Sequence, residues 1–126
     1  MLHYWGQSVA IVPLCEIDLR IVTLTGAWFD VRAFEGEVFV VQQVGLIAGL
    51  APTLSGKLQD ALDASGTGAA DMSGAAFTQV SSSNNHQKMV FRPNAIRGWI
   101  RYIGTIGGTT PSITFGATLF GIRKYS

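Results

Sequence analysis

The chain has 126 residues, of which 48% are hydrophobic and only 13% are charged, and its formal net charge is +1. This length suits a single domain with one core, and the apolar content excludes a chain that is disordered throughout. The single cysteine, Cys15, excludes an internal disulfide and a metal site built from several thiolates. So few charges leave neutral or apolar surface, which often marks an interface.

Residues 1–26 are expected to form an N-terminal arm or an edge strand. Residues 1–5 lack the basic region of a secretory signal, so we expect an intracellularly made, soluble product. Residues 16–21 alternate charged and apolar side chains, which is typical of a half-buried strand.

Period-two patterns predict two further strands before residue 45. Residues 28–33 alternate, with Trp28 and Arg32 on one face. Residues 35–36 indicate a turn. Residues 38–41 form a continuous β-branched and aromatic run, which predicts a central strand that extends through residue 44.

The middle of the chain predicts short strands separated by loops. Residues 53–60 carry leucines at helical spacing, but Pro52 before them and a glycine within them favour a strand. Residues 63–74 are rich in Ala, Gly and Ser and predict an exposed loop. Residues 77–80 predict a short strand, and residues 88–92 predict another that ends at a proline.

Residues 94–123 predict a β-hairpin. Trp99 and Arg101 lie on one face of its first arm and Tyr102 lies on the other. The Gly-Gly-Thr-Thr sequence at 107–110 predicts the turn. One face of the second arm is lined by Ile113, Phe115, Ala117 and Leu119.

These elements predict an all-β fold, an antiparallel jelly-roll-like β-sandwich of about eight strands in residues 27–126. The apolar run at 38–50 is interrupted by two glutamines and is far shorter than the ~20 residues that span a bilayer, so no membrane contact is expected.

Charge is unevenly distributed along the chain. All eight acids lie between Glu16 and Asp71, and residues after Asp71 carry six bases and no acid. One reading is a basic patch for nucleic acid. The bases are scattered, which favours a second interpretation, in which the acidic and basic halves of the chain interleave and their charges pair. Direct nucleic-acid binding is therefore not expected.

The sequence predicts no enzyme, no metal and no cofactor. Neither His3 nor His86 has other ligands at metal-binding spacing. The glycines at 66–68 lack the pattern of a phosphate-binding loop. Asp60 and Asp63 could act as a paired acid and base, as in glycoside hydrolysis, and a surface loop with acids is the favoured interpretation.

Aromatic residues are the main candidates for an interaction site. Exposed tryptophans stack on sugars or anchor protein interfaces, and Trp99 shares a predicted face with Arg101, which suggests a stacking contact between them. A core or half-buried position is the favoured alternative for Trp28 and Trp99, and core packing is an equal alternative for Trp5. The candidate interface residues are Leu2, Tyr4, Trp5, Trp28, Trp99 and Arg101.

The segments at 29–35, 38–45, 57–60, 77–80 and 97–101 resemble a group of small structural proteins of tailed bacteriophages and prophages. Members of this group are capsid cement or decoration proteins with a jelly-roll-like β-sandwich. The resemblance implies a non-enzymatic protein on the capsid exterior, made in the host cytoplasm. It implies the major capsid protein as partner and a homo-oligomer, a dimer or a trimer.

The resemblance covers residues 26–123 and has two departures. Gly98 and Trp99 stand where the group often has a basic and an aromatic residue, and the loop at 61–66 has fewer acids than usual. Residues 1–26 lie before this region and carry many apolar side chains that should not stay in water, so they are expected to pack as an arm against a neighbouring copy or the capsid, with their own sheet as the alternative. A carbohydrate-binding module that uses exposed tryptophans and a small hydrolase that uses Asp60 and Asp63 are the rival functions.

Overall fold

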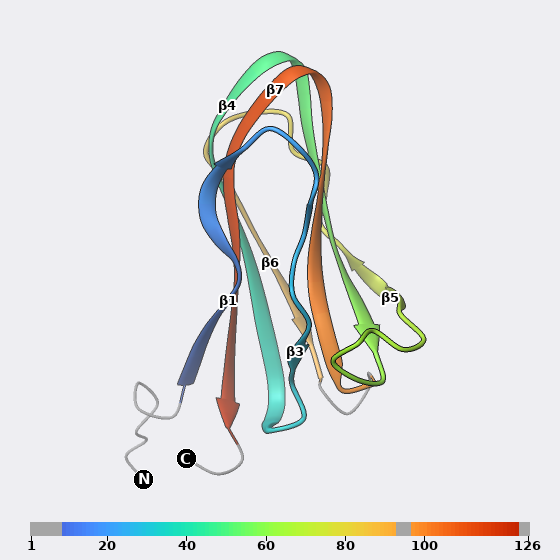
Figure 1. The fold of residues 1–126 in the computed structure, drawn as a ribbon. Helices are drawn as coiled ribbons and strands as arrows, with labels where there is room; N and C mark the ends of the chain where they lie inside the picture. Colours follow the sequence, from blue (N-terminus) through green and yellow to red (C-terminus); the bar gives the residue numbers. More distant parts are fainter. Residues whose placement is uncertain (1–8, 93–96, 124–126) are drawn as a thin grey trace, which may run out of the picture.

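The computed structural model describes residues 9–92 and 97–123, and every regular element in these ranges is a strand (Figure 1). The strands are β1 (Val9–Arg20), β2 (Leu24–Thr25), β3 (Phe29–Asp30), β4 (Phe34–Ala61), β5 (Ala70–Ala76), β6 (Asn85–Phe91) and β7 (Trp99–Arg123). All the pairings between these strands are antiparallel. The predicted all-β fold is therefore confirmed.

A long ribbon made of β4 and β7 organises the fold. The two strands pair from Phe34 opposite Arg123 to Ala61 opposite Trp99. Both arch over together near their middles and return along the molecule (Figure 1). The register of the pair slips between Val44 and Thr53 of β4. Positive φ angles of 115° at Gly49 and 111° at Gly108 make the bend, and glycine adopts such angles without steric cost.

Folding the ribbon in half creates two layers. The first layer contains β1, the second half of β7, the first half of β4 and β6, in that order. The second layer contains β2 and β3, the first half of β7, the second half of β4 and β5. This arrangement is a jelly-roll-like β-sandwich, as the sequence predicts.

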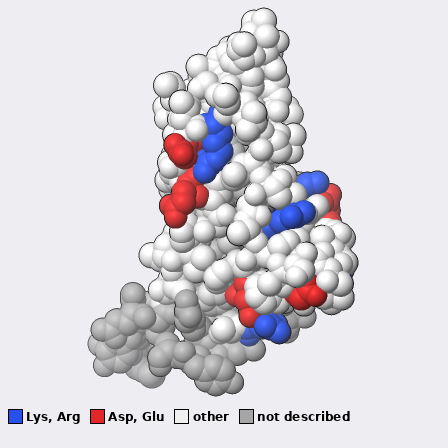
Figure 2. Space-filling view, in the orientation of Figure 1, with Lys and Arg blue, Asp and Glu red and all other residues white. Residues whose placement is uncertain are grey.

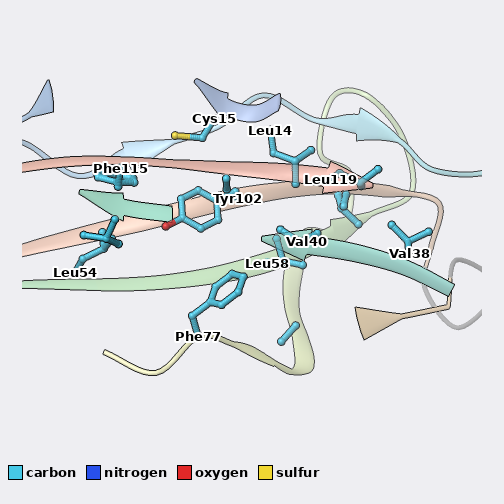
Figure 3. Packing of buried hydrophobic residues seen from close by; sticks show 14 of the residues in the cluster. Leu14, Cys15, Val38, Val40, Leu54, Leu58, Phe77, Tyr102, Phe115 and Leu119 are labelled. Carbon is cyan, nitrogen blue, oxygen red and sulfur yellow. The ribbon is translucent and has the colours of Figure 1, made fainter. Parts of the chain in front are cut away.

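The core lies between the two layers, where inward-facing residues of β4 and β7 meet those of β1 (Figure 3). Ile100 and Tyr102 of the first half of β7 are fully buried, and so are the four residues expected to line one face of the second half. The largest fully buried side chains are Tyr102, Phe115, Leu54, Leu58, Ile100, Ile113 and Leu119.

A polar pair is buried within this core. The Tyr102 hydroxyl donates a hydrogen bond of 2.5 Å to Oε1 of Gln42, whose side chain is fully buried. A Cβ atom at Gly56 would lie 1.9 Å from that Oε1 and 2.6 Å from the Tyr102 oxygen. Glycine at position 56 therefore makes the room in which the pair fits.

The structure corrects four local predictions. Within the predicted hairpin, the described residues 99–123 form no hairpin, because the two halves of β7 pair with β4 and not with each other. Residues 77–80 form no strand, only an isolated bridge between Val80 and Leu54. The expected loop at 63–74 ends at Ala70, where β5 begins. The expected turn at 35–36 lies inside β4 at a register slip, with Gly36 at a φ of 69°.

The described part of the N-terminal region belongs to the sandwich. Residues 9–20 are β1, which pairs with β7 from Val9 opposite Ile122 to Arg20 opposite Ile113. Cys15 is buried in this strand, and burial raises the pKa of its thiol.

Candidate interaction face

The outer surface of the second layer carries a row of side chains in register across neighbouring strands. Arg101 of β7 pairs with Gln59 of β4, which pairs with Asp71 of β5. The Arg101 guanidinium donates to Oε1 of Gln59 at 3.0 and 2.8 Å, and Nε2 of Gln59 donates to Asp71 at 2.8 Å. Lys57 also lies 3.1 Å from Asp71. Hydrogen bonds from Gln59 and Lys57 lower the pKa of the Asp71 carboxyl.

Trp28 completes the row at the other end. The Arg101 guanidinium lies over its ring, 4.4 Å from the centroid. Gly66 also lies close to the indole, because a Cβ atom at that position would lie 2.8 Å from the Trp28 indole nitrogen. The indole is therefore half-buried against an arginine and the loop that follows β4.

A second arginine–tryptophan pair lies beside the first. Asp30 of β3 is opposite Trp99 of β7, and Arg32 lies 5.5 Å over the Trp99 ring. Arg32 also donates to both oxygens of Asp30 at 2.9 and 2.8 Å. The hydrogen bond from Arg32 lowers the pKa of the Asp30 carboxyl. We call these residues the arginine–tryptophan face: Trp28, Asp30, Arg32, Gln59, Trp99 and Arg101.

The structure places Trp28, Trp99 and Arg101 on one outer face, but it assigns different partners from those predicted. Trp99 stacks with Arg32, and Arg101 stacks with Trp28. Sequence reasoning missed the roles of Arg32 and Gln59. The alternation at 28–33 had already placed Arg32 on the same face as Trp28, so its position was available as a signal.

The other three candidate interface residues, Leu2, Tyr4 and Trp5, lie outside the described residues, as does His3.

The two acids considered for catalysis have structural roles. Asp60 accepts a 2.7 Å hydrogen bond from the Arg97 guanidinium and a 3.3 Å bond from the Arg97 backbone N–H, which ties the end of β4 to the start of β7. Asp63 accepts bonds from the backbone N–H groups of Ser65 and Thr67, and hydrogen bonds from Thr67 lower the pKa of its carboxyl.

Charges of both signs lie side by side in small groups, and large areas of the visible face carry no charge (Figure 2). The pairing of Arg97 with Asp60 is the kind of contact expected when the two halves of the chain interleave. On the face that Figure 2 shows, the basic side chains do not gather into one patch.

Other features add no chemistry to this face. His86 is exposed on β6, opposite Gln43 of β4. Within residues 9–92 and 97–123, no three His, Cys, Asp or Glu side chains come together as they would around a metal ion. The same ranges contain no helix with the length and apolar character needed to cross a membrane.

Comparison with known proteins gives a fold similarity. No family model and no curated protein matches the sequence. Part of the VP2 protein in the infectious bursal disease virus subviral particle matches 91% of this chain, with a TM-score of 0.54 and 14% identity. The structure of the Gx strain of the same virus matches 94% of the chain, with a TM-score of 0.56 and 9% identity.

The matched regions make up 32% and 33% of those viral chains, so this chain spans about a third of their length. The SPBc2 prophage-derived protein YomS is matched over 95% of its length and 90% of this chain at 13% identity, but with a TM-score of only 0.46. At these identities the viral structures show that the fold is shared: the sandwich has the architecture of one part of VP2.

Proposed function

We propose that the chain is a non-enzymatic structural protein of a virus particle, and more specifically a capsid cement or decoration protein of a tailed phage or prophage. One observation carries the proposal. Nearly the whole described sandwich is matched by a part of VP2, a protein that is found in a subviral particle. The fold alone does not fix a function, so the surface must support the role as well.

The surface suits a protein that packs against others. Large apolar side chains are exposed on β1 and on the β4 arch, including Ile11, Ile17, Leu46 and Leu50, each at least 59% exposed. The arginine–tryptophan face offers two of the three residue types enriched in the energetic centres of protein interfaces. The proposed partner is the major capsid protein on the capsid exterior. Because a capsid would carry many symmetry-related copies of the chain, we also propose a homo-oligomer, a dimer or a trimer.

A sugar-binding role would use the same tryptophans, because sugars stack on open indole faces. Here an arginine lies over each ring, 4.4 Å from the Trp28 centroid and 5.5 Å from the Trp99 centroid. This stacking reduces the area open to a sugar, so we favour a protein contact. Glycan-array binding that disappears in Trp28→Ala would redirect the proposal.

The test compares capsids with and without the protein. A protein that binds only the assembled capsid stabilises it by mass action. Capsids made by the encoding virus or prophage without this gene should bind the purified protein in a sedimentation assay, and decorated capsids should open at higher temperature. Capsids that bind no protein, or that open at the same temperature with saturating protein bound, would overturn the proposal.

A pair of variants tests whether the arginine–tryptophan face makes the contact. Arg101→Glu reverses the charge that stacks on Trp28 and bonds to Gln59. We expect it to weaken capsid binding at least tenfold. The control is Arg92→Glu, the same charge change at an exposed residue just after β6, and it should bind as the wild type does. Equal binding by both variants would place the contact elsewhere.

A further inference from the structure

The outer face of the first layer carries a stripe of exposed aliphatic side chains where β1 runs up to the arch (Figure 1). Ile17 and Leu19 of β1 and Ile21 just after it follow one another at the two-residue period of a strand, and they are 59%, 57% and 66% exposed. We call these three residues the aliphatic stripe. The outer face of an antiparallel sandwich is normally polar, so the stripe indicates a surface that another molecule covers.

A bulge in β1 holds the stripe in place. The register between β1 and β7 shifts between Cys15 and Asp18, and the Arg20 guanidinium fastens this bulge. It donates to the backbone oxygen of Glu16 at 2.6 Å and to that of Phe115 in β7 at 2.7 Å. The stripe is therefore fixed before a partner binds, which lowers the entropy cost of association.

Small residues of β7 lie beside the stripe. A Cβ atom at Gly116 would lie 2.5 Å from the Ile17 side chain, so Ile17 rests directly on the Gly116 backbone. Leu19 is opposite Thr114. Beyond Thr114, the register slip of β4 contains Leu46, which is 69% exposed. The aliphatic surface therefore continues from β1 to β4.

We infer that two copies of the chain pack through the aliphatic stripe about a two-fold axis and form a homodimer. The inference rests on the homo-oligomer of the proposed function and gives it a contact surface. An isologous interface brings the same patch of both copies together, so a charged patch would repel itself. The stripe and Leu46 carry no charge, and the upper end of the molecule, around the arch, shows no charged side chain on the visible face (Figure 2). Asp18 and Arg20, which alternate with the stripe, are opposite the buried Phe115 and Ile113 and so lie on the inward side of β1.

The size of the surface also suits a second copy. The stripe and Leu46, each at least 57% exposed, make an apolar patch on the order of 400 Å², within the range of the largest patch on a typical monomer, which is often functional. Gln43 of β4, opposite Gly116, and His86 of β6, opposite Gln43, are exposed and supply a polar rim. Patch and rim together approach the ~800 Å² per partner of a stable interface. Homodimer interfaces are also more apolar than contacts between different proteins. The arginine–tryptophan face lies on the second layer and stays open for the capsid.

Sedimentation equilibrium of the full chain without capsids tests the inference. The chain has a mass of 13.5 kDa, and we expect twice that mass above about 10 μM, because interfaces of standard size bind at micromolar or tighter constants. Leu19→Lys places a charge in the stripe and should raise the dissociation constant at least tenfold. The control is Leu62→Lys, the same change at a leucine that is 56% exposed in the loop after β4, and it should leave the constant unchanged. A wild-type chain that stays a monomer at ten times that concentration, a trimer, or equal effects of the two variants would overturn the inference.

Circular dichroism checks that both variants keep the β fold, and Ile21→Lys replaces Leu19→Lys if the latter does not fold. Photo-crosslinking then locates the contact. A benzophenone amino acid replaces Ile17 in protein of natural isotope content, which is mixed with an equal amount of heavy-isotope protein without the probe. We expect light-to-heavy crosslinks to the peptides that contain Leu19 or Thr114, and light-to-heavy crosslinks confined to other peptides would contradict the assignment. A monomer that binds capsids would overturn only this inference, whereas a dimer that binds none would overturn only the proposed capsid role.

Discussion

The hydrogen bond between Tyr102 and Gln42 yields the sharpest stability prediction. Tyr102→Phe removes only a hydroxyl, but that hydroxyl donates to Oε1 of Gln42 at 2.5 Å in a fully buried site. Within the described part of the chain, Nε2 of Gln42 already has no hydrogen-bond partner. The variant therefore leaves a buried amide without its remaining partner, and a buried group without a partner costs about 1–3 kcal/mol.

Urea unfolding measures this cost. With a slope of ~1–3 kcal/mol per molar urea for a small protein, a loss of about 2 kcal/mol lowers the midpoint by roughly 1 M. Gln42→Leu combined with Tyr102→Phe removes both polar groups, and such a paired replacement can be nearly neutral. The double variant should therefore be more stable than Tyr102→Phe alone. A double variant whose loss equals or exceeds the sum of the two single losses would refute the reasoning.

Gly56 gives an independent check on the same pair. Gly56→Ala places a methyl group where Gln42 Oε1 and the Tyr102 hydroxyl lie, and such overpacking costs about 1–3 kcal/mol. The same substitution in a Gln42→Ala background loses its closest contact, the one at 1.9 Å, and keeps the one with the Tyr102 oxygen, so its cost should fall. Equal costs in the two backgrounds would mean that Gln42 is not the group that limits the space.

Three further predictions concern the titratable side chains. Burial raises the pKa of the Cys15 thiol, so it should react with a thiol reagent at neutral pH only after unfolding, and rapid reaction of the native protein would contradict this. Because the pKa of Asp30 is lower in the folded state, its ionised carboxyl stabilises the fold above about pH 4, and this stabilisation is lost as the pH falls through the folded pKa. Asp30→Asn should therefore lose less stability in acid than the wild type does, as measured by urea midpoints. Asp60→Ala, which removes charge-assisted hydrogen bonds at a largely buried carboxylate, should cost about 1.5–3 kcal/mol, whereas Asp71→Ala at an exposed pair should cost under about 1 kcal/mol.

Local alternation predicted which residues share a face of each strand. Ile100 and Tyr102 are buried while Trp99 and Arg101 face outward, because the side-chain period of a strand is a local property. The partner of each strand is not local. Residues 107–110 do mark a change of direction, but a bend and a hairpin turn use similar residues. What makes residues 107–110 a bend is β4, whose own bend lies about sixty residues earlier in the chain. Because β4 bends beside β7, each half of β7 pairs with β4 on that side and not with the other half of β7.

The same limit applies to the candidate site. The sequence placed Trp99 and Arg101 on one face of a strand and Trp28 and Arg32 on one face of another, but which arginine covers which ring depends on the register between β3, β7 and β4. That register sets Asp30 opposite Trp99 and thereby brings Arg32 over the Trp99 ring. No pattern within one segment contains this information.

The most direct test of the proposed function is cryo-electron microscopy of particles made by the virus or prophage that encodes the chain. We predict density for the two-layered sandwich in symmetry-related copies on the outside of the capsid, with the arginine–tryptophan face against the major capsid protein. Particles that contain no copy of the chain by mass spectrometry, and whose outer surface shows no such density, would contradict the account.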